Sequence, residues 1–199
     1  MESLAEDKIE LIGAQDFPDI GTIEENGLSY EENAAIKAVA WANFAGMPAL
    51  ADDSGLEARA LDWEPGIHSA RVSSGSDADR TRWLLSRMEN HEDRRARFVA
   101  CIVIAFPDNE KTGRGYFSSQ GICRGRITRA PEGHCGFGYD PVFVPDGYDA
   151  TFAEMGAAIK SKISHRALAM QGVAHIMQSV VKYNAVRHST HGVYGGLTI

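Results

Sequence analysis

The feature that most limits the folds open to this chain is a nearly unbroken apolar run at residues 98–106, FVACIVIAF. A run of this length that is rich in β-branched residues is typical of a strand buried on both faces. Residues 115–122 predict a neighbouring strand, and residues 48–51 predict another that gives way to a turn at residues 52–55. The core is therefore expected to contain a buried β-sheet.

Three further segments have the apolar spacing of helices. Ser29 and Glu32 have the spacing of a capping box, which predicts a helix over residues 29–46. A second helix is expected at about residues 77–89, and a third begins at Ser164 with apolar side chains along one face. Because helices and strands are interspersed along the chain, we expect an α/β fold with a mixed, bent sheet flanked by helices.

No internal repeat, low-complexity block or flexible linker divides the chain into separate folding units. We therefore expect a single domain over residues 1–199. The helical pattern fades after Tyr183, so residues from about 184 to 199 are expected to form an irregular tail.

Charge and cysteine content argue against several classes of function. The chain has 27 acidic and 20 basic residues and a net charge of -7, which disfavours nucleic acid as its main partner. Its three cysteines form no C-x-x-C pair, and no stretch resembles a signal peptide or a membrane span. These features favour a protein of the reducing cytoplasm that has no membrane partner.

Two acidic pairs are candidates for metal or base chemistry. Glu24 and Glu25 precede Gly27, and paired carboxylates could hold a hard cation such as Mg²⁺. Asp52 and Asp53 follow an apolar stretch, where clustered negative charge is destabilising unless a cation or hydrogen bonds compensate it. Ordinary solvated charge is the alternative, above all for Glu24 and Glu25.

Three other segments could bind an electron-rich or flat ligand. Lys37 lies within an otherwise apolar helical segment, from which it could reach a phosphate or extend into solvent. At residues 136–141, two glycines flank an aromatic ring, which suits either a flat ligand or a plain aromatic turn. Lys160 precedes the Ser-His-Arg sequence at residues 164–166, whose donors could converge on a ligand at a helix start. Helix capping accounts for Ser164 but not for the whole group.

These segments belong to a set of six motifs. They are EENG at 24–27, Glu32-Asn33 followed by Lys37, ADDSG at 51–55, PGIHSAR at 65–71, GFGYDP at 136–141 and SHR at 164–166. In content and order, over about residues 5–180, the chain resembles the inosine triphosphate pyrophosphatase family. Each motif alone is weak, whereas ADDSG, GFGYDP and SHR together are specific.

The resemblance implies a fold and a function. The fold would be elongated and two-lobed, with a nucleotide cleft between the lobes, and members usually form homodimers. The function would be hydrolysis of unusual purine nucleoside triphosphates (ITP, dITP and XTP) to the monophosphate and pyrophosphate, which cleanses the nucleotide pool.

The resemblance also implies roles at the phosphate end of the substrate. Glu25 and Asp53 would hold Mg²⁺ against the triphosphate, and Asp53 or its neighbour Asp52 would activate the attacking water. Lys37 and Lys160 would neutralise charge that develops on the phosphate oxygens.

At the base end, the resemblance assigns an aromatic platform and a set of donors. A 6-keto purine presents an acceptor where adenine presents a donor, so a pocket of donors would reject adenine. The residues implied are Phe137, which would stack on the purine, Asp140, His165 and Arg166 at the base edge, Ser54 nearby, and Gly138 and Tyr139 of the same motif.

The start of the chain departs from the family pattern. Members normally begin with a strand that leads into a Thr/Ser-x-Asn-x-x-Lys loop, which grips the triphosphate, and nothing of this kind precedes Leu4. We therefore expect a domain that is shortened at its N-terminus relative to the family. Two alternatives stay open: a non-catalytic nucleotide-binding remnant, and a related pyrophosphatase for other modified nucleotides.

Overall fold

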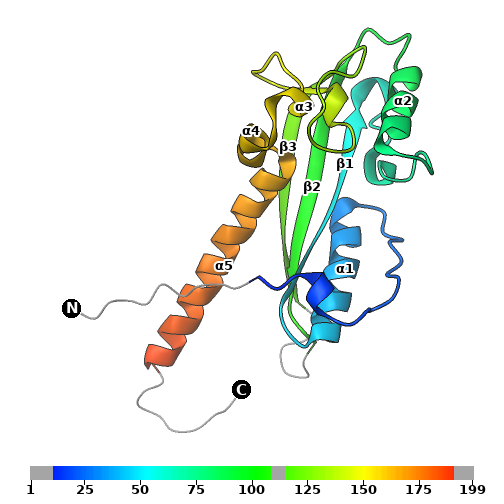
Figure 1. The fold of residues 1–199 in the computed structure, drawn as a ribbon. Coiled ribbons are helices and arrows are strands. Elements are labelled where there is room, and N and C mark those ends of the chain that lie inside the picture. The colour runs from blue at the N-terminus through cyan, green and yellow to red at the C-terminus, as the bar shows by residue number, and fades with distance from the viewer. Residues whose placement is uncertain (1–10, 109–114, 191–199) are drawn as a thin grey trace.

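The computed structural model describes residues 11–108 and 115–190. A four-stranded sheet forms its centre, with the strands in the order β1-β2-β3-β4 (Figure 1). The strands are β1 (Ala49–Ala58), β2 (Arg95–Ala105), β3 (Tyr116–Ile127) and the short β4 (Phe143–Pro145). The strand expected at residues 98–106 is confirmed as most of β2, and the strand expected at residues 115–122 as the first part of β3.

The sheet is antiparallel at every described pair, whereas a mixed sheet was expected. The reason lies in the connection between β1 and β2. The chain leaves β1 at Ala58 and re-enters the sheet at Arg95, after a segment that includes α2 (Asp77–Arg87) and stays at the upper end of Figure 1. Because the chain re-enters at the end where it left, β2 must run opposite to β1.

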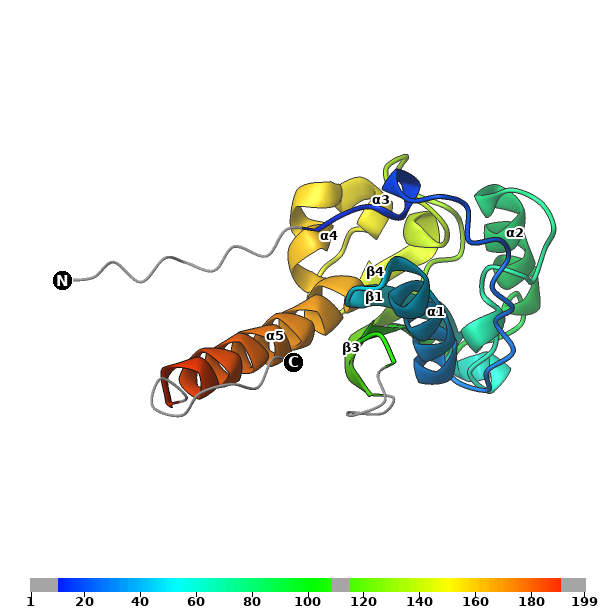
Figure 2. The same cartoon turned by 90° about the horizontal axis from the view of Figure 1, so that it is seen from below.

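Two helices cover opposite faces of the sheet, as the view from below shows (Figure 2). Helix α1 (Tyr30–Ala45) packs on β1 and β2, and helix α5 (His165–Thr190) packs on β2 and β3. The side chains of β2 alternate between them: Val99, Cys101 and Val103 pack with α1, while Ala100 and Ile102 pack with α5. This double burial explains the unbroken apolar run in the sequence.

Helix α1 begins where the sequence predicts. Ser29 Oγ accepts a hydrogen bond from the Glu32 backbone N–H at 3.1 Å, and Glu32 Oε2 accepts one from the Leu28 backbone N–H at 2.7 Å. The helix ends at Gly46, whose φ of 66° is left-handed. Its buried face consists largely of alanines, which lets the helix lie close to the sheet.

A separate core fills the upper end of the molecule in Figure 1, where α2, α3 (Phe152–Met155) and α4 (Ala157–Ile163) gather. It packs Leu56 and Phe98 of the sheet against the rings of Phe143 and Phe152. The molecule is therefore elongated, with apolar clusters on both faces of the lower sheet and another at its upper end.

The structure corrects the expected turn at residues 52–55. Strand β1 runs through this stretch to Ala58, paired with β2 from Ala49 opposite Ala105 to Ala58 opposite Ala96. Leu56 and Ala58 are fully buried in the upper core. Pairing with β2 and the burial of these two side chains outweigh the local turn preference of Asp-Asp-Ser-Gly.

The expected tail from 184 is also corrected in part. Helix α5 continues to Thr190, and residues 191–199 lie outside the described part of the chain. The apolar stripe ends near Tyr183, but no glycine or proline follows before Gly192, so nothing local stops the helix there. Within the described residues, no helix is both long and apolar enough to cross a membrane.

Candidate active site

A carboxylate–lysine cluster forms where α1 faces β1. Lys37 Nζ lies 3.1 Å from Glu25 Oε1 and 3.4 Å from Asp53 Oδ1. Asn33, one helical turn before Lys37, donates from Nδ2 to Asp53 Oδ2 at 3.3 Å. Arg71 pairs with the other oxygen of Glu25, at 2.9 Å. The structure thus brings together Glu25, Lys37 and Asp53, as expected.

The electrostatics of this cluster favour a proton acceptor at Asp53. Burial raises the pKa of Asp53 above its ordinary value, and the nearby Glu25 adds to the rise, while Lys37 and Asn33 oppose it. The Asp53 side chain is only 12 % exposed. A carboxylate with a raised pKa binds a proton more readily than a free one, which suits a general base.

The same cluster fits a shared Mg²⁺ ion. Glu25 and Asp53 each place an oxygen against the Lys37 ammonium, so positive charge is stabilised between them. Within residues 11–108 and 115–190, no group of three or more His, Cys, Asp or Glu side chains forms a metal cage. Mg²⁺ commonly uses only one or two protein carboxylates, with waters and substrate phosphates as its other ligands. These residues therefore fit Mg²⁺ only together with a phosphorylated ligand.

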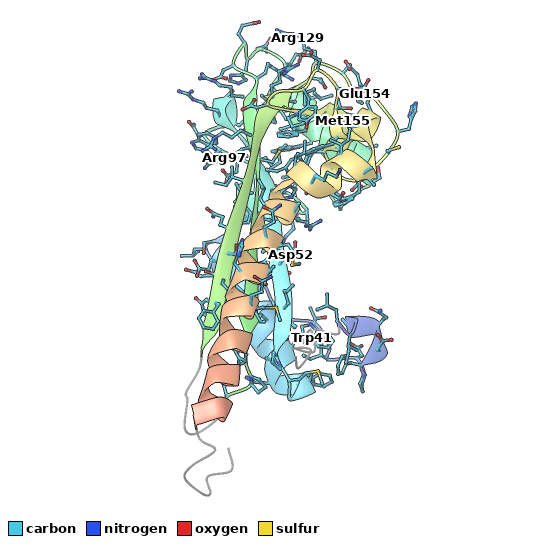
Figure 3. All side chains as sticks on the ribbon, turned by 90° about the vertical axis from the view of Figure 1, so that its left-hand side faces the viewer. Trp41, Asp52, Arg97, Arg129, Glu154 and Met155 are labelled. Carbon is cyan, nitrogen blue, oxygen red and sulfur yellow. The ribbon has the colours of Figure 1, made fainter. Side chains whose placement is uncertain are left out.

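Asp52 lies on the other face of β1 from Asp53, because successive side chains of a strand alternate. Its Oδ2 accepts a hydrogen bond from Arg166 Nε at 2.8 Å. Figure 3 shows Asp52 on β1 beside α5. The two neighbouring acids therefore face different partners and do not converge on one point.

A pocket of about 160 Å³ opens on the Asp52 side of β1. Phe137 stands at its wall with 58 % of its surface exposed. Lys160 Nζ lies 4.2 Å from the centre of the Phe137 ring, and Arg166 Cζ lies 5.5 Å from it. The pocket includes Ser54, Phe137, Gly138, Tyr139, Asp140, Lys160, His165 and Arg166, so it gathers every residue expected at the base end.

Asp140 supports this wall of the pocket from the protein interior. It is 1 % exposed, and its Oδ2 accepts the Phe137 backbone N–H at 3.0 Å and pairs with the Lys160 ammonium. Gly136 has φ of 83°, and a Cβ there would lie 2.0 Å from the same oxygen, so the loop needs glycine. Asp140 was expected at the base edge, but its carboxylate supports the loop and Lys160.

Gly138 and Tyr139 are tied to the scaffold in the same way. The Gly138 backbone N–H donates to Asp77 Oδ2 at 2.6 Å, and its carbonyl accepts from the Thr81 hydroxyl at 3.2 Å. The buried Tyr139 hydroxyl donates to the Ser69 carbonyl at 3.0 Å, and burial raises the pKa of Tyr139 to about 12. Both residues position the loop that carries Phe137.

His165 supplies a neutral imidazole to the pocket. It is 6 % exposed and stacks on Phe98 with ring centres 4.6 Å apart. Burial, and then the charges of Arg166 and Lys160, lower the pKa of His165 to about 3. Its Nδ1 is buried and has no hydrogen-bond partner among the described residues.

The start of α5 can lie this close to the sheet because of Gly121 in β3. A Cβ at Gly121 would lie 2.0 Å from the His165 carbonyl oxygen and 2.4 Å from the Ala169 backbone nitrogen. Only glycine leaves room for this contact between helix and strand. The sequence offered no separate signal for Gly121, nor for Phe98, which is hidden in the apolar run.

A larger cavity of about 720 Å³ lies between α2 and the loop that carries Phe137. It shares Phe137, Gly138 and Asp77 with the smaller pocket. Its arginines, Arg82 and Arg129, are already paired with acids at 2.7 and 3.1 Å. The smaller pocket brings Phe137 together with His165 and Arg166, which do not line the larger cavity, and it is therefore the better candidate for recognition of a base.

Residues 52–54 of β1 join the two clusters. Asp53 belongs to the carboxylate–lysine cluster, while Asp52 contacts Arg166 and Ser54 lines the pocket. A ligand with a flat ring in the pocket could thus extend its polar end around the strand. The two lysines are separated: Lys37 lies with the carboxylates, and Lys160 lies over Phe137.

Comparison with known proteins identifies relatives of this chain. The model of the Ham1 family matches residues 1–176. A dITP/XTP pyrophosphatase of Deinococcus radiodurans is 47% identical over 148 residues, which is 74% of this chain and 72% of that protein.

Solved structures agree. A HAM1 protein from Coxiella burnetii has a TM-score of 0.74 and 36% sequence identity, covering 80% of this chain and 82% of that one. The Staphylococcus aureus Ham1 protein has a TM-score of 0.73 and 38% identity, covering 80% and 81%. On the family match, the shared fold and the sequence identity, this chain belongs to the Ham1 family.

Proposed function

We propose that this protein hydrolyses unusual purine nucleoside triphosphates, namely ITP, dITP and XTP, to the nucleoside monophosphate and pyrophosphate. The observation that carries the proposal is that residues 52–54 join a donor-lined pocket to a carboxylate–lysine cluster. One end suits a purine and the other suits phosphates. Relatives in Deinococcus radiodurans and Aquifex aeolicus carry the name dITP/XTP pyrophosphatase, which supports this activity.

At the phosphate end, Asp53 takes the proton of the water that attacks the α-phosphorus. The bond from that phosphorus to the β-bridging oxygen breaks, and pyrophosphate leaves. Glu25 and Asp53 would hold Mg²⁺, which when bound neutralises charge on the phosphate oxygens. Lys37 contributes positive charge at the same place, and Asn33 orients the Asp53 carboxylate.

Asp53, rather than Asp52, is the base in this proposal. Asp53 faces Glu25 and Lys37, whereas Asp52 faces Arg166 on the other side of the strand. Lys160 lies over Phe137, so we assign it to the nucleotide near the base rather than to the leaving pyrophosphate.

At the base end, Phe137 stacks on the purine while His165 and Arg166 meet its edge. The guanidinium of Arg166 can only donate, and the 6-keto oxygen of hypoxanthine or xanthine can only accept. Adenine would place an amino donor against this donor and leave both unsatisfied. A pocket of this kind can discriminate by roughly 10⁴-fold.

Arg166→Ala tests this assignment. The variant should lose kcat/KM for ITP by a larger factor than kcat/KM for ATP, so that its preference for ITP over ATP falls. The measurement is kcat/KM for both nucleotides from pyrophosphate release. Equal losses on both substrates would contradict a role in base recognition.

We also propose that the protein works as a homodimer in the cytoplasm, without a nucleic acid partner. The resemblance to a family whose members usually dimerise supports the first point. The cytoplasmic location is supported by substrates from the nucleotide pool and by three free cysteines, Cys101, Cys123 and Cys135. Light scattering after size-exclusion chromatography gives the mass that tests the dimer.

A further inference from the structure

We propose that Asp52 is a positioning residue for base recognition: its carboxylate fixes the guanidinium of Arg166, and so it sets the substrate preference. The inference rests on the proposed function, because it concerns the same pocket. It gives Asp52 a role different from that of its neighbour Asp53, which lies in the carboxylate–lysine cluster.

Two anchors hold the guanidinium. Arg166 Nε donates to Asp52 Oδ2 at 2.8 Å, and Nη2 donates to Ser54 Oγ at 3.1 Å. Asp52 and Ser54 are two residues apart in β1, so their side chains share one face of the strand. Two contacts from one rigid strand fix both the place and the orientation of a planar group.

The anchored group keeps donors for a ligand. A guanidinium has five N–H donors, and these two contacts use two of them. Its carbon lies 5.5 Å from the centre of the Phe137 ring, the platform proposed for the purine. The remaining N–H groups are therefore held close to where the edge of a stacked base would lie.

The contact with Asp52 is poorly suited to a role in stability. The Arg166 side chain is 44 % exposed and that of Asp52 is 38 % exposed. Ion pairs this exposed add little to the free energy of unfolding, because water and salt screen them. A free arginine side chain, however, would lose much rotational freedom on meeting a ligand, and a held one would not.

The test compares Asp52→Ala, Arg166→Ala and the double variant, with kcat/KM for ITP and ATP and the thermal midpoint. Asp52→Ala should lower the ITP/ATP preference about tenfold or more, with the midpoint within about 2 °C of wild type. The double variant should lose no more preference than Arg166→Ala alone, because both changes remove one interaction. Asp52→Asn should keep part of the preference, since its amide oxygen can still accept from Nε.

Glu92→Ala is the matched control. It also breaks an exposed carboxylate–arginine pair, with Arg129 at 3.1 Å, but away from the pocket. It should leave both kcat/KM values unchanged. The proposal is overturned if Asp52→Ala lowers activity on ITP and ATP by the same factor, or if its effect on preference adds in full to that of Arg166→Ala.

A second readout does not depend on turnover. The NMR signal of Arg166 Nε–H, identified by its loss in Arg166→Ala, should exchange slowly with solvent in the wild type and rapidly in Asp52→Ala. Exchange that is equally fast in both proteins would contradict the claim that Asp52 holds the Arg166 guanidinium. If the wild type released no pyrophosphate from ITP, the proposed function would fail, while this signal would still decide whether Asp52 holds the guanidinium of Arg166.

Discussion

Replacing His165 with glutamine should remove part of the acid sensitivity of this protein. The folded-state pKa of His165 is lowered to about 3 from its ordinary value of 6.5. The causes are burial against Phe98 and the positive charges of Arg166 and Lys160. Below pH 6.5 the unfolded chain binds a proton that the folded chain does not, so stability is lost as the pH falls toward 3.

The magnitude follows from the two pKa values. Between these two pKa values, the free energy of unfolding falls by up to about 1.4 kcal/mol for each unit by which the pH is lowered. From pH 7.5 to 4.5 the loss from this one group is about 2.5 kcal/mol. A typical domain has a total stability of about 5 to 15 kcal/mol, so the effect should be easy to measure.

The assay is urea unfolding of wild type and His165→Gln at several pH values between 7.5 and 4.5. As the pH falls, the wild type should lose more unfolding free energy than His165→Gln, so the variant becomes more stable relative to the wild type. His91→Gln, at an exposed position in the described structure, is the control and should follow the wild type. Identical pH profiles for wild type and His165→Gln would show that burial of a neutral His165 does not cause the loss of stability in acid.

Three further predictions concern the reaction and the scaffold. Asp53→Asn should lower kcat by about 10² to 10⁴, because it removes a general base, while the circular dichroism spectrum stays that of the wild type. Gly121→Val should lower the free energy of unfolding by about 1 to 3 kcal/mol or more in urea titrations, because its Cβ would lie 2.0 Å from the His165 carbonyl oxygen. Thr151→Ala should cost about 1 to 2 kcal/mol in the same assay, since the buried Thr151 caps α3 by accepting the Glu154 backbone N–H at 3.2 Å.

Much of the fold could be predicted because its signals are local. The apolar run of β2 indicates burial on both faces, and the structure shows α1 on one side and α5 on the other. The cap at Ser29 and the stop at Gly46 fix the ends of α1 within a residue. The motifs also named residues that the structure gathers at two neighbouring places.

The rest depends on contacts between distant residues. Asp-Asp-Ser-Gly has the composition of a turn, and only pairing with β2 shows that it is strand, with Asp52 and Asp53 on opposite faces. Likewise, no local pattern indicates that Asp140 supports Phe137 and Lys160 from inside. These features arise from packing that brings together residues far apart in sequence.

The most direct test of the account is pyrophosphate release by this chain from ITP, dITP and XTP, with ATP as control, with and without Mg²⁺. The proposed function predicts release that needs Mg²⁺, favours the three unusual nucleotides over ATP, and is lost in Asp53→Asn. Saturable binding of ITP without any release would contradict it and indicate a protein that only binds nucleotides. Equal release from ITP and ATP would contradict the proposed recognition of the base by His165 and Arg166.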